Sequence, residues 1–204
     1  MENKPYHHGD LRRLLIETGL EMISKEGEDK LSLRKVAAQC HVSNAAPYAH
    51  FSSKDEFIGA IQKHIMDTFT QTLEETAQQY QDTNELLPKL GKAYVLFFYH
   101  HPLYYDFLFS RKNMKISLSL ETIHKNEIPP LEILKKAAIQ SFKKTGMSKE
   151  AIQDSVIAMW AFVHGLSAIM IMPDVKFDYD LESKIEDIIK SSAFSSFILR
   201  EEQS

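Results

Sequence analysis

The segment LSLRKVAAQCHVSNAAPYAHFSSK, residues 31–54, constrains the fold of this chain more than any other. Ser32 comes before a short run of apolar residues at helical spacing, which predicts a capped helix. A tight turn is predicted at residues 41–42, and Ser43 is expected to cap a second short helix that ends at about residue 50. Two short helices joined by so tight a turn predict a helix-turn-helix. The residues expected to face its core are Leu33, Val36, Ala37, Val42 and Phe51.

Charge is distributed unevenly around this segment. The whole chain has a formal net charge of -4, and residues 1–64 hold nine Lys/Arg and nine Asp/Glu. No Asp or Glu, however, lies between Lys30 and Lys54. An acid-free surface on a helix-turn-helix favours contact with nucleic acid, because carboxylates would repel the phosphates. We therefore predict that the first quarter of the chain binds double-stranded DNA.

The second helix of such a motif enters the major groove, while the first helix braces it. Asn44 could hydrogen-bond a base edge there, and the methyl group of Ala45 could contact a thymine methyl. Pro47 removes one helical hydrogen bond, at a small cost so close to the start. Tyr48 and His50 could reach phosphates or could instead pack against the first helix. The residues predicted to contact bases or phosphates are Arg34, Ser43, Asn44, Ala45, Tyr48, His50 and Lys54.

The rest of the chain has apolar residues at helical spacing and no alternating strand pattern. We predict an all-α fold in which an N-terminal three-helix domain, residues 1–53, is joined by a long helix to a C-terminal helical bundle within residues 54–204. Asp10 is expected to cap the first helix and Gly27 to end it. Residues 111–126 show no clear period. Further helices are predicted at about 54–80, 85–100, from Pro102, from Pro129, at 148–172 and at 181–200.

Composition limits the surroundings in which this chain works. Cys40 is the single cysteine, which excludes an intramolecular disulfide and fits a reducing compartment. Its thiol is expected to be a small buried apolar group or, alternatively, a redox sensor. The N-terminus lacks the apolar core of a signal peptide, and no run of 18 apolar residues appears. We therefore expect a cytoplasmic protein without a membrane span.

Aromatic residues crowd residues 94–109, and a second group lies near residue 160. Such clusters usually form core, so Trp160 and His164 could be ordinary packing residues. They could also line a cavity for an apolar or aromatic small molecule, oriented by Tyr hydroxyls or by His. The candidate lining residues are Tyr94, Phe98, His101, Tyr105, Trp160 and His164.

The sequence VSNAAPYAHFSSKDEF resembles the signature of the TetR family, and SLRKVAAQ matches the preceding helix of that family. This resemblance covers residues 10–57. It implies that Arg34 and Asn44 face bases and that Tyr48, His50 and Lys54 bind phosphates. It also implies a small-molecule effector bound in the C-terminal body, a palindromic operator and repression as the expected sign, although activation stays open.

The motifs WAFVHGLS and HPLYYDFLF resemble the TetR C-terminal subgroup named for its Trp-His-Gly residues, here Trp160, His164 and Gly165. The predicted helices at 148–172 and 181–200 carry more apolar residues than one exposed face permits. The chain could bury them internally, but the resemblance implies a homodimer through these two helices.

Enzymatic function is not expected. The sequence has no HExxH, paired CxxC, GxSxG or glycine-rich phosphate loop, and its adjacent His pairs are poorly placed to chelate one metal. We accordingly predict no catalytic residues, no metal site and no cofactor. The alternative from a different class is a helical sensor of a small molecule or haem that lacks sequence-specific DNA binding.

Overall fold

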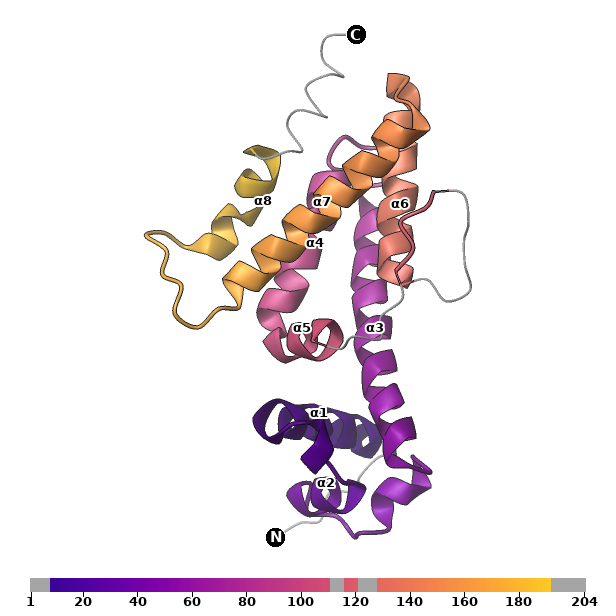
Figure 1. The fold of residues 1–204 in the computed structure, drawn as a ribbon, viewed down its shortest axis with the longest axis vertical. Helices are drawn as coiled ribbons and strands as arrows, with labels where there is room; N and C mark the ends of the chain where they lie inside the picture. The colour runs from indigo at the N-terminus through magenta and orange to yellow at the C-terminus, as the bar shows by residue number, and fades with distance from the viewer. Residues whose placement is uncertain (1–7, 111–115, 121–127, 192–204) are drawn as a thin grey trace. The chain divides into compact units, whose positions relative to one another are not determined.

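The computed structural model describes residues 8–110, 116–120 and 128–191 of the 204-residue chain (Figure 1). These residues form α-helices and short 3-10 helices, with no strand in the described ranges, which confirms the all-α fold class. The 3-10 segments are η1 (Glu28–Lys30), η2 (Ala46–Ala49) and η3 (Lys143–Thr145). The α-helices are α1 (His8–Glu26), α2 (Leu33–Gln39), α3 (Lys54–Gln79), α4 (Leu86–His100), α5 (Pro102–Phe109), α6 (Pro129–Phe142), α7 (Lys149–Met170) and α8 (Leu181–Ser191).

The chain divides into two compact units. The first contains the described residues of Met1–Asp67 and Leu103–Lys112, and the second contains those of Thr68–Pro102 and Asn113–Ser204. Helix α3 therefore begins in the first unit and ends in the second, whereas α5 belongs almost entirely to the first.

Local chemistry in the first unit follows most of the sequence predictions. Gly27 ends α1 with φ of 86°, a left-handed conformation that favours glycine. The Ser32 hydroxyl accepts the backbone N–H of Lys35 at 3.3 Å and caps α2. His41 has φ of 56° in the predicted turn. The prediction for Asp10 is wrong, because α1 already begins at His8 and Asp10 lies within it.

A close contact between α1 and α3 closes the core of the first unit. A Cβ atom built on Gly19 would lie 2.5 Å from the ring of Phe57, so the two helices approach at a residue without a side chain. The ring of Phe57 is fully buried and meets Phe51 edge-on, with centroids 4.8 Å apart. The other fully or almost fully buried residues of this core include Leu15, Ile16, Val36, Ala37, Ile61 and Ile65.

The second unit is built around α4, which packs against α6, α7 and α8. Gly91 lies where α4 meets its neighbours, and a Cβ atom there would lie 3.3 Å from both Val163 and Ile189. Ser148 caps α7, its hydroxyl accepting the N–H of Ala151 at 3.2 Å. Gly146, at φ of 70°, ends the preceding turn.

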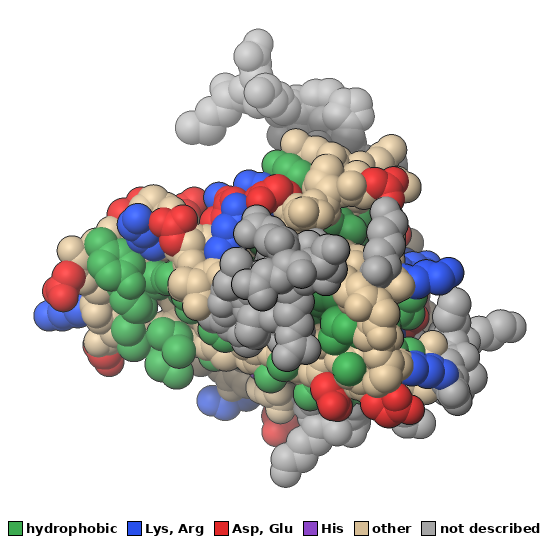
Figure 2. All heavy atoms as spheres, turned by 90° about the horizontal axis from the view of Figure 1, so that it is seen from above, with side chains coloured by type: hydrophobic (Ala, Val, Ile, Leu, Met, Phe, Trp, Pro, Cys, Tyr) green, Lys and Arg blue, Asp and Glu red, His purple; other side chains and the backbone are tan. Residues whose placement is uncertain are grey.

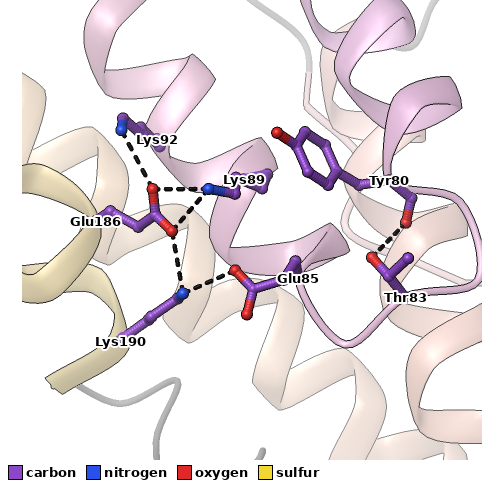
Figure 3. Close-up of polar contacts among 7 residues, drawn as sticks. All are labelled: Tyr80, Thr83, Glu85, Lys89, Lys92, Glu186 and Lys190. Atoms are coloured by element: carbon purple, nitrogen blue, oxygen red, sulfur yellow. Dashed lines mark hydrogen bonds and ion pairs between the residues drawn. The ribbon is translucent and has the colours of Figure 1, made fainter.

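An ion cluster holds α8 against α4 (Figure 3). The Glu186 carboxylate accepts hydrogen bonds from Lys89 at 2.8 Å and from Lys92 at 3.2 Å, both on α4. Lys190, one turn further along α8, lies 3.0 Å from the same carboxylate and donates to Glu85 at 2.7 Å. These three ammonium groups lower the pKa of Glu186 to about 2, mainly through the hydrogen bonds from Lys89 and Lys190. The cluster ties together two helices about a hundred residues apart in the sequence.

Among the described residues, one helix, α7, is long and apolar enough to cross a membrane by length and composition alone, with mean hydropathy of 1.3. The sequence prediction missed it because the helix has no unbroken apolar run. Its buried residues include Val156, Met159 and Val163, and it packs against α4 and α6. Of the apolar window in this helix, 33% is buried within the single chain.

Apolar side chains are also exposed on the second unit. Figure 2 shows hydrophobic side chains gathered at its left edge, where the segment between α7 and α8 lies in Figure 1. Helix α8 is described only to Ser191, so the predicted extension to residue 200 lies outside the described residues. The exposed apolar residues of α7 and of this segment are Ile157, Ile169, Met172, Val175, Phe177 and Tyr179.

Candidate nucleic-acid interface

The second helix of the motif is shorter and tighter than predicted. The structure has a 3-10 helix at Ala46–Ala49, and the Ser43 hydroxyl does not cap it. Pro47 is the cause. In an α-helix that started after Ser43, the first hydrogen bond would run from the backbone N–H of residue 47 to the Ser43 carbonyl, but proline has no backbone N–H. Instead, the N–H of Ala46 donates to the Ser43 carbonyl at 3.0 Å, and the N–H of Tyr48 donates to the Ala45 carbonyl at 3.1 Å. The prediction of a Ser43-capped helix over residues 43–50 is therefore corrected.

Most of the side chains predicted to contact DNA lie on the surface of the first unit. Ser43, Asn44 and Ala45 are exposed in the turn that leads into η2, and the Tyr48 side chain is 51% exposed. His50 is half-buried, with its ring 6.0 Å from that of Phe51. On α2, the Arg34 side chain is exposed.

Lys54 has a structural partner inside the protein. Its ammonium group donates to the backbone carbonyl of Glu28 at 2.7 Å and reaches that of Asp29 at 3.4 Å. It thereby ties the start of α3 to η1. An ammonium carries three donors, so this arrangement leaves room for a phosphate oxygen as a further acceptor.

The start of α3 is fixed by a second set of hydrogen bonds. Ser53 accepts the N–H of Glu56 at 3.1 Å, and the Glu56 carboxylate in turn binds the backbone N–H of Ser52 at 2.7 Å and the Ser52 hydroxyl. These bonds lower the pKa of the Glu56 carboxyl. The segment between η2 and α3 is thus held by these hydrogen bonds.

A polar cluster that the sequence reasoning missed lies in the first unit, on three different helices. The Glu17 carboxylate on α1 accepts the Tyr104 hydroxyl of α5 at 2.7 Å and lies 3.1 Å from Nε2 of His64 on α3. The hydrogen bond with His64 lowers the pKa of Glu17, and burial raises that of Tyr104. Helix α5 is therefore joined to α1 and α3 by these polar contacts.

The residues predicted to line a ligand cavity are only partly brought together. In the second unit, the Tyr94 hydroxyl lies 3.1 Å from Nδ1 of His164, and the rings of Trp160 and His164 are 5.7 Å apart. Burial lowers the pKa of His164. Tyr94 and Phe98 belong to a buried aromatic group that also includes Phe69 and Phe97. His101 is exposed beside the Phe97 ring, and Tyr105 lies on α5 in the first unit.

Known proteins match the chain in two ways. Residues 15–61 match the family model described as "Bacterial regulatory proteins, tetR family". A curated relative, an uncharacterized HTH-type transcriptional regulator, YuxN, of Bacillus subtilis (strain 168), is 32% identical over 62 residues, which cover 30% of this chain and 21% of that protein. The sequence match thus spans about a fifth of the relative's length and is confined to a short part of both proteins.

Solved structures resemble the chain over almost its whole length. A protein of unknown function from Rhodococcus sp. RHA1 aligns with a TM-score of 0.67 at 19% identity, covering 96% of this chain and 97% of that one. AibR, solved with isovaleryl coenzyme A and operator DNA, aligns with a TM-score of 0.63 at 16% identity, covering 88% and 96%. A putative fatty acid metabolism regulator of Clostridium perfringens aligns with a TM-score of 0.64 at 13% identity, covering 87% of this chain and 95% of that one. Residues 15–61 of this chain are therefore similar to the tetR-family helix-turn-helix domain, and the chain as a whole shares the all-helical fold of these solved structures.

Proposed function

We propose that this protein is a ligand-responsive transcriptional repressor that binds a palindromic operator as a homodimer. The observation that supports it best is the recognition turn of a tetR-family domain, with Asn44, Ala45 and Tyr48 exposed and no carboxylate between Lys30 and Lys54. Residues 1–53 bind the operator, and residues 54–204 bind the effector and dimerise. The protein acts in the cytoplasm and is not an enzyme.

The proposed contacts with DNA divide by chemistry. Arg34, Asn44 and Ala45 face the bases of the major groove, while Ser43, Tyr48 and His50 bind phosphates. Lys54 adds a phosphate contact while it holds the carbonyl of Glu28.

Two copies of the chain are needed to bind a palindrome. The exposed apolar residues on α7 and on the segment that follows it support a dimer surface that includes α7 and α8. Such a dimer places two recognition turns on half-sites one DNA turn (~34–36 Å) apart, or a multiple of it.

The effector is a small apolar or aromatic molecule bound in the second unit. Phe98, Tyr94 and Trp160 offer apolar surface, and the Tyr94 and His164 pair offers polar groups within hydrogen-bond distance of each other. We assign the second unit to the Trp-His-Gly subgroup because Trp160 and His164 share a face of α7. AibR, a structural neighbour, was solved with isovaleryl coenzyme A, which supports an effector with an apolar, branched acyl group. His101, exposed beside the Phe97 ring in the same unit, completes the proposed pocket.

Genome-wide selection of DNA fragments by the purified protein tests the proposal. A palindromic site should be enriched, and its affinity should fall steeply with salt. Tyr48→Ala should weaken binding to that site, while Tyr99→Ala, which removes an exposed tyrosine of the second unit, should not.

The alternative is a helical sensor of a small molecule or haem without sequence-specific binding. That sensor would enrich no fragment and would bind DNA weakly and without regard to sequence. Absorbance of the purified protein then separates a haem sensor from the others.

A further inference from the structure

Arg12 stands apart from the other cations of the first unit. Several of those cations are neutralised inside the unit: Lys25 pairs with Glu21, Lys35 with Glu26, and Lys63 with Asp67. Arg12, by contrast, is exposed and has no hydrogen bond or ion pair with any described residue. A guanidinium in this state keeps all five N–H donors available.

An aromatic ring nevertheless fixes the position of this guanidinium. Its central carbon lies 5.4 Å from the centroid of the Phe51 ring. The Phe51 side chain is buried, held edge-on by Phe57, and directly follows His50 at the end of the recognition turn. The side chain of Arg12 therefore lies beside that turn.

One acid, Glu56, interacts with this cation only through charge. Arg12 contributes to lowering the pKa of Glu56, but the Glu56 carboxylate makes its hydrogen bonds with the backbone and hydroxyl of Ser52. The N–H donors of Arg12 thus remain available for an external anion.

We propose that Arg12 is a DNA-backbone ligand that adds a phosphate contact from α1 to those of the recognition turn. The Phe51 ring holds the guanidinium in place before DNA binds, so little side-chain freedom is lost on binding. A phosphate oxygen accepts the free N–H donors, and the contact carries no base specificity. This inference rests on the proposed function, because it places the operator against the same face.

Arg13 provides a matched control. It is the next residue on α1, is also exposed, and carries the same charge. Since successive residues of a helix point about 100° apart, its side chain leaves in another direction. Its positive charge lies near Glu17 and Tyr104 and lowers the pKa of both groups.

The experiment compares Arg12→Gln and Arg13→Gln on two duplexes of equal length, one carrying the site that the wild-type protein enriches and the other a scrambled sequence. Because the proposed homodimer carries two copies of Arg12, Arg12→Gln should weaken binding to both duplexes and reduce the slope of log affinity against log salt by about 1.8. Its deficit relative to wild type should therefore shrink about 12-fold between 50 and 200 mM salt. Arg13→Gln should leave the slope unchanged.

Equal slope changes in the two variants would overturn the inference, because they would show only the effect of net charge. An unchanged slope in Arg12→Gln would overturn it as well. Thermal melting of both variants without DNA establishes that they fold equally well. Failure of the proposed function looks different: the wild-type protein would then enrich no site, and the slopes of Arg12→Gln and Arg13→Gln would still be compared on the scrambled duplex.

Discussion

The two units of this protein are stabilised by different means. The first unit is held by local devices close together in the sequence, such as the Ser32 cap, the left-handed Gly27 and the bonds between Ser52 and Glu56. The second unit relies on long apolar helices and on the Glu186 cluster, whose hydrogen bond to Lys89 spans 97 positions. The first unit also has one long-range group, in which Glu17 binds His64 and Tyr104, so the two units differ in the share of local devices rather than in kind.

The largest expected effect compares the two cores directly. Phe57 and Phe98 are both fully buried, the first in unit one and the second in unit two. Truncating either to Ala should cost about 3–5 kcal/mol of unfolding free energy, through lost burial and the cavity left behind. Urea unfolding, followed by the fluorescence of Trp160 and by circular dichroism, measures both losses.

The two probes decide whether the units are independent. If the units are independent, Phe57→Ala should shift the unfolding transition seen by circular dichroism. It should leave the transition seen by Trp160 fluorescence unchanged, because Trp160 lies in the second unit. A Trp160 transition that shifts equally in both variants would show a single cooperative unit and would remove the distinction between them.

Local chemistry explains which parts of the first unit could be predicted. Ser32, Gly27 and the turn at His41 follow from the preferences of single residues, and all three are confirmed. The helix at residues 43–50 was predicted wrongly because proline was treated as a small loss. In a helix this short, the first hydrogen bond is the one that Pro47 removes.

Long-range contacts explain what the sequence could not indicate. Neither the Glu186 cluster nor the group of Glu17, His64 and Tyr104 has a periodic or motif signal, because its members come from distant helices. The helical spacing of Trp160 and His164 correctly put them on one face of α7. Spacing alone could not place Tyr105 in the first unit.

The second-largest effect tests the close approach of helices in the first unit. Gly19→Ala should destabilise the protein by about 1–3 kcal/mol, because its new Cβ would lie 2.5 Å from the buried Phe57 ring. Gly59→Ala on α3 is the control: nothing lies within 4 Å of its Cβ, and helix propensity should stabilise the variant by up to about 1 kcal/mol. Chemical denaturation of both variants measures the difference, and the same sign in both would contradict the packing described for α1 and α3.

A smaller effect tests the ion cluster of the second unit. Glu186→Gln leaves Lys89, Lys92 and Lys190 without their shared carboxylate and should cost about 1–2 kcal/mol at pH 7, since solvent screens part of the interaction. The pKa of Glu186 falls from 4.5 in the unfolded chain to about 2, so its contribution is complete above pH 4.5. The difference between wild type and variant should therefore decline as the pH falls from 4.5 towards 2.

Asp187→Asn is the control for this prediction. Asp187 also lies on α8 and pairs with a lysine, Lys184, but both side chains are more than half exposed. Its loss should change stability by at most about 0.5 kcal/mol. A pH-independent deficit in Glu186→Gln would show that the carboxylate acts through packing rather than charge.

The smallest effect concerns the polar pair proposed for the effector pocket. Tyr94→Phe removes the hydroxyl that lies 3.1 Å from His164, and the substitution should lower the free energy of unfolding by about 0.5–1.5 kcal/mol.

Because burial lowers the pKa of His164 below 6.5, the folded protein binds fewer protons at this residue than the unfolded chain does. The stability that His164 contributes is thus complete above pH 6.5 and declines as the pH falls towards its folded pKa. Unfolding at pH 7.5 and 5.5 should show this decline in the wild-type protein and not in His164→Gln. An identical loss in His164→Gln would assign the decline to other groups and leave the second unit without a titrating residue at its proposed pocket.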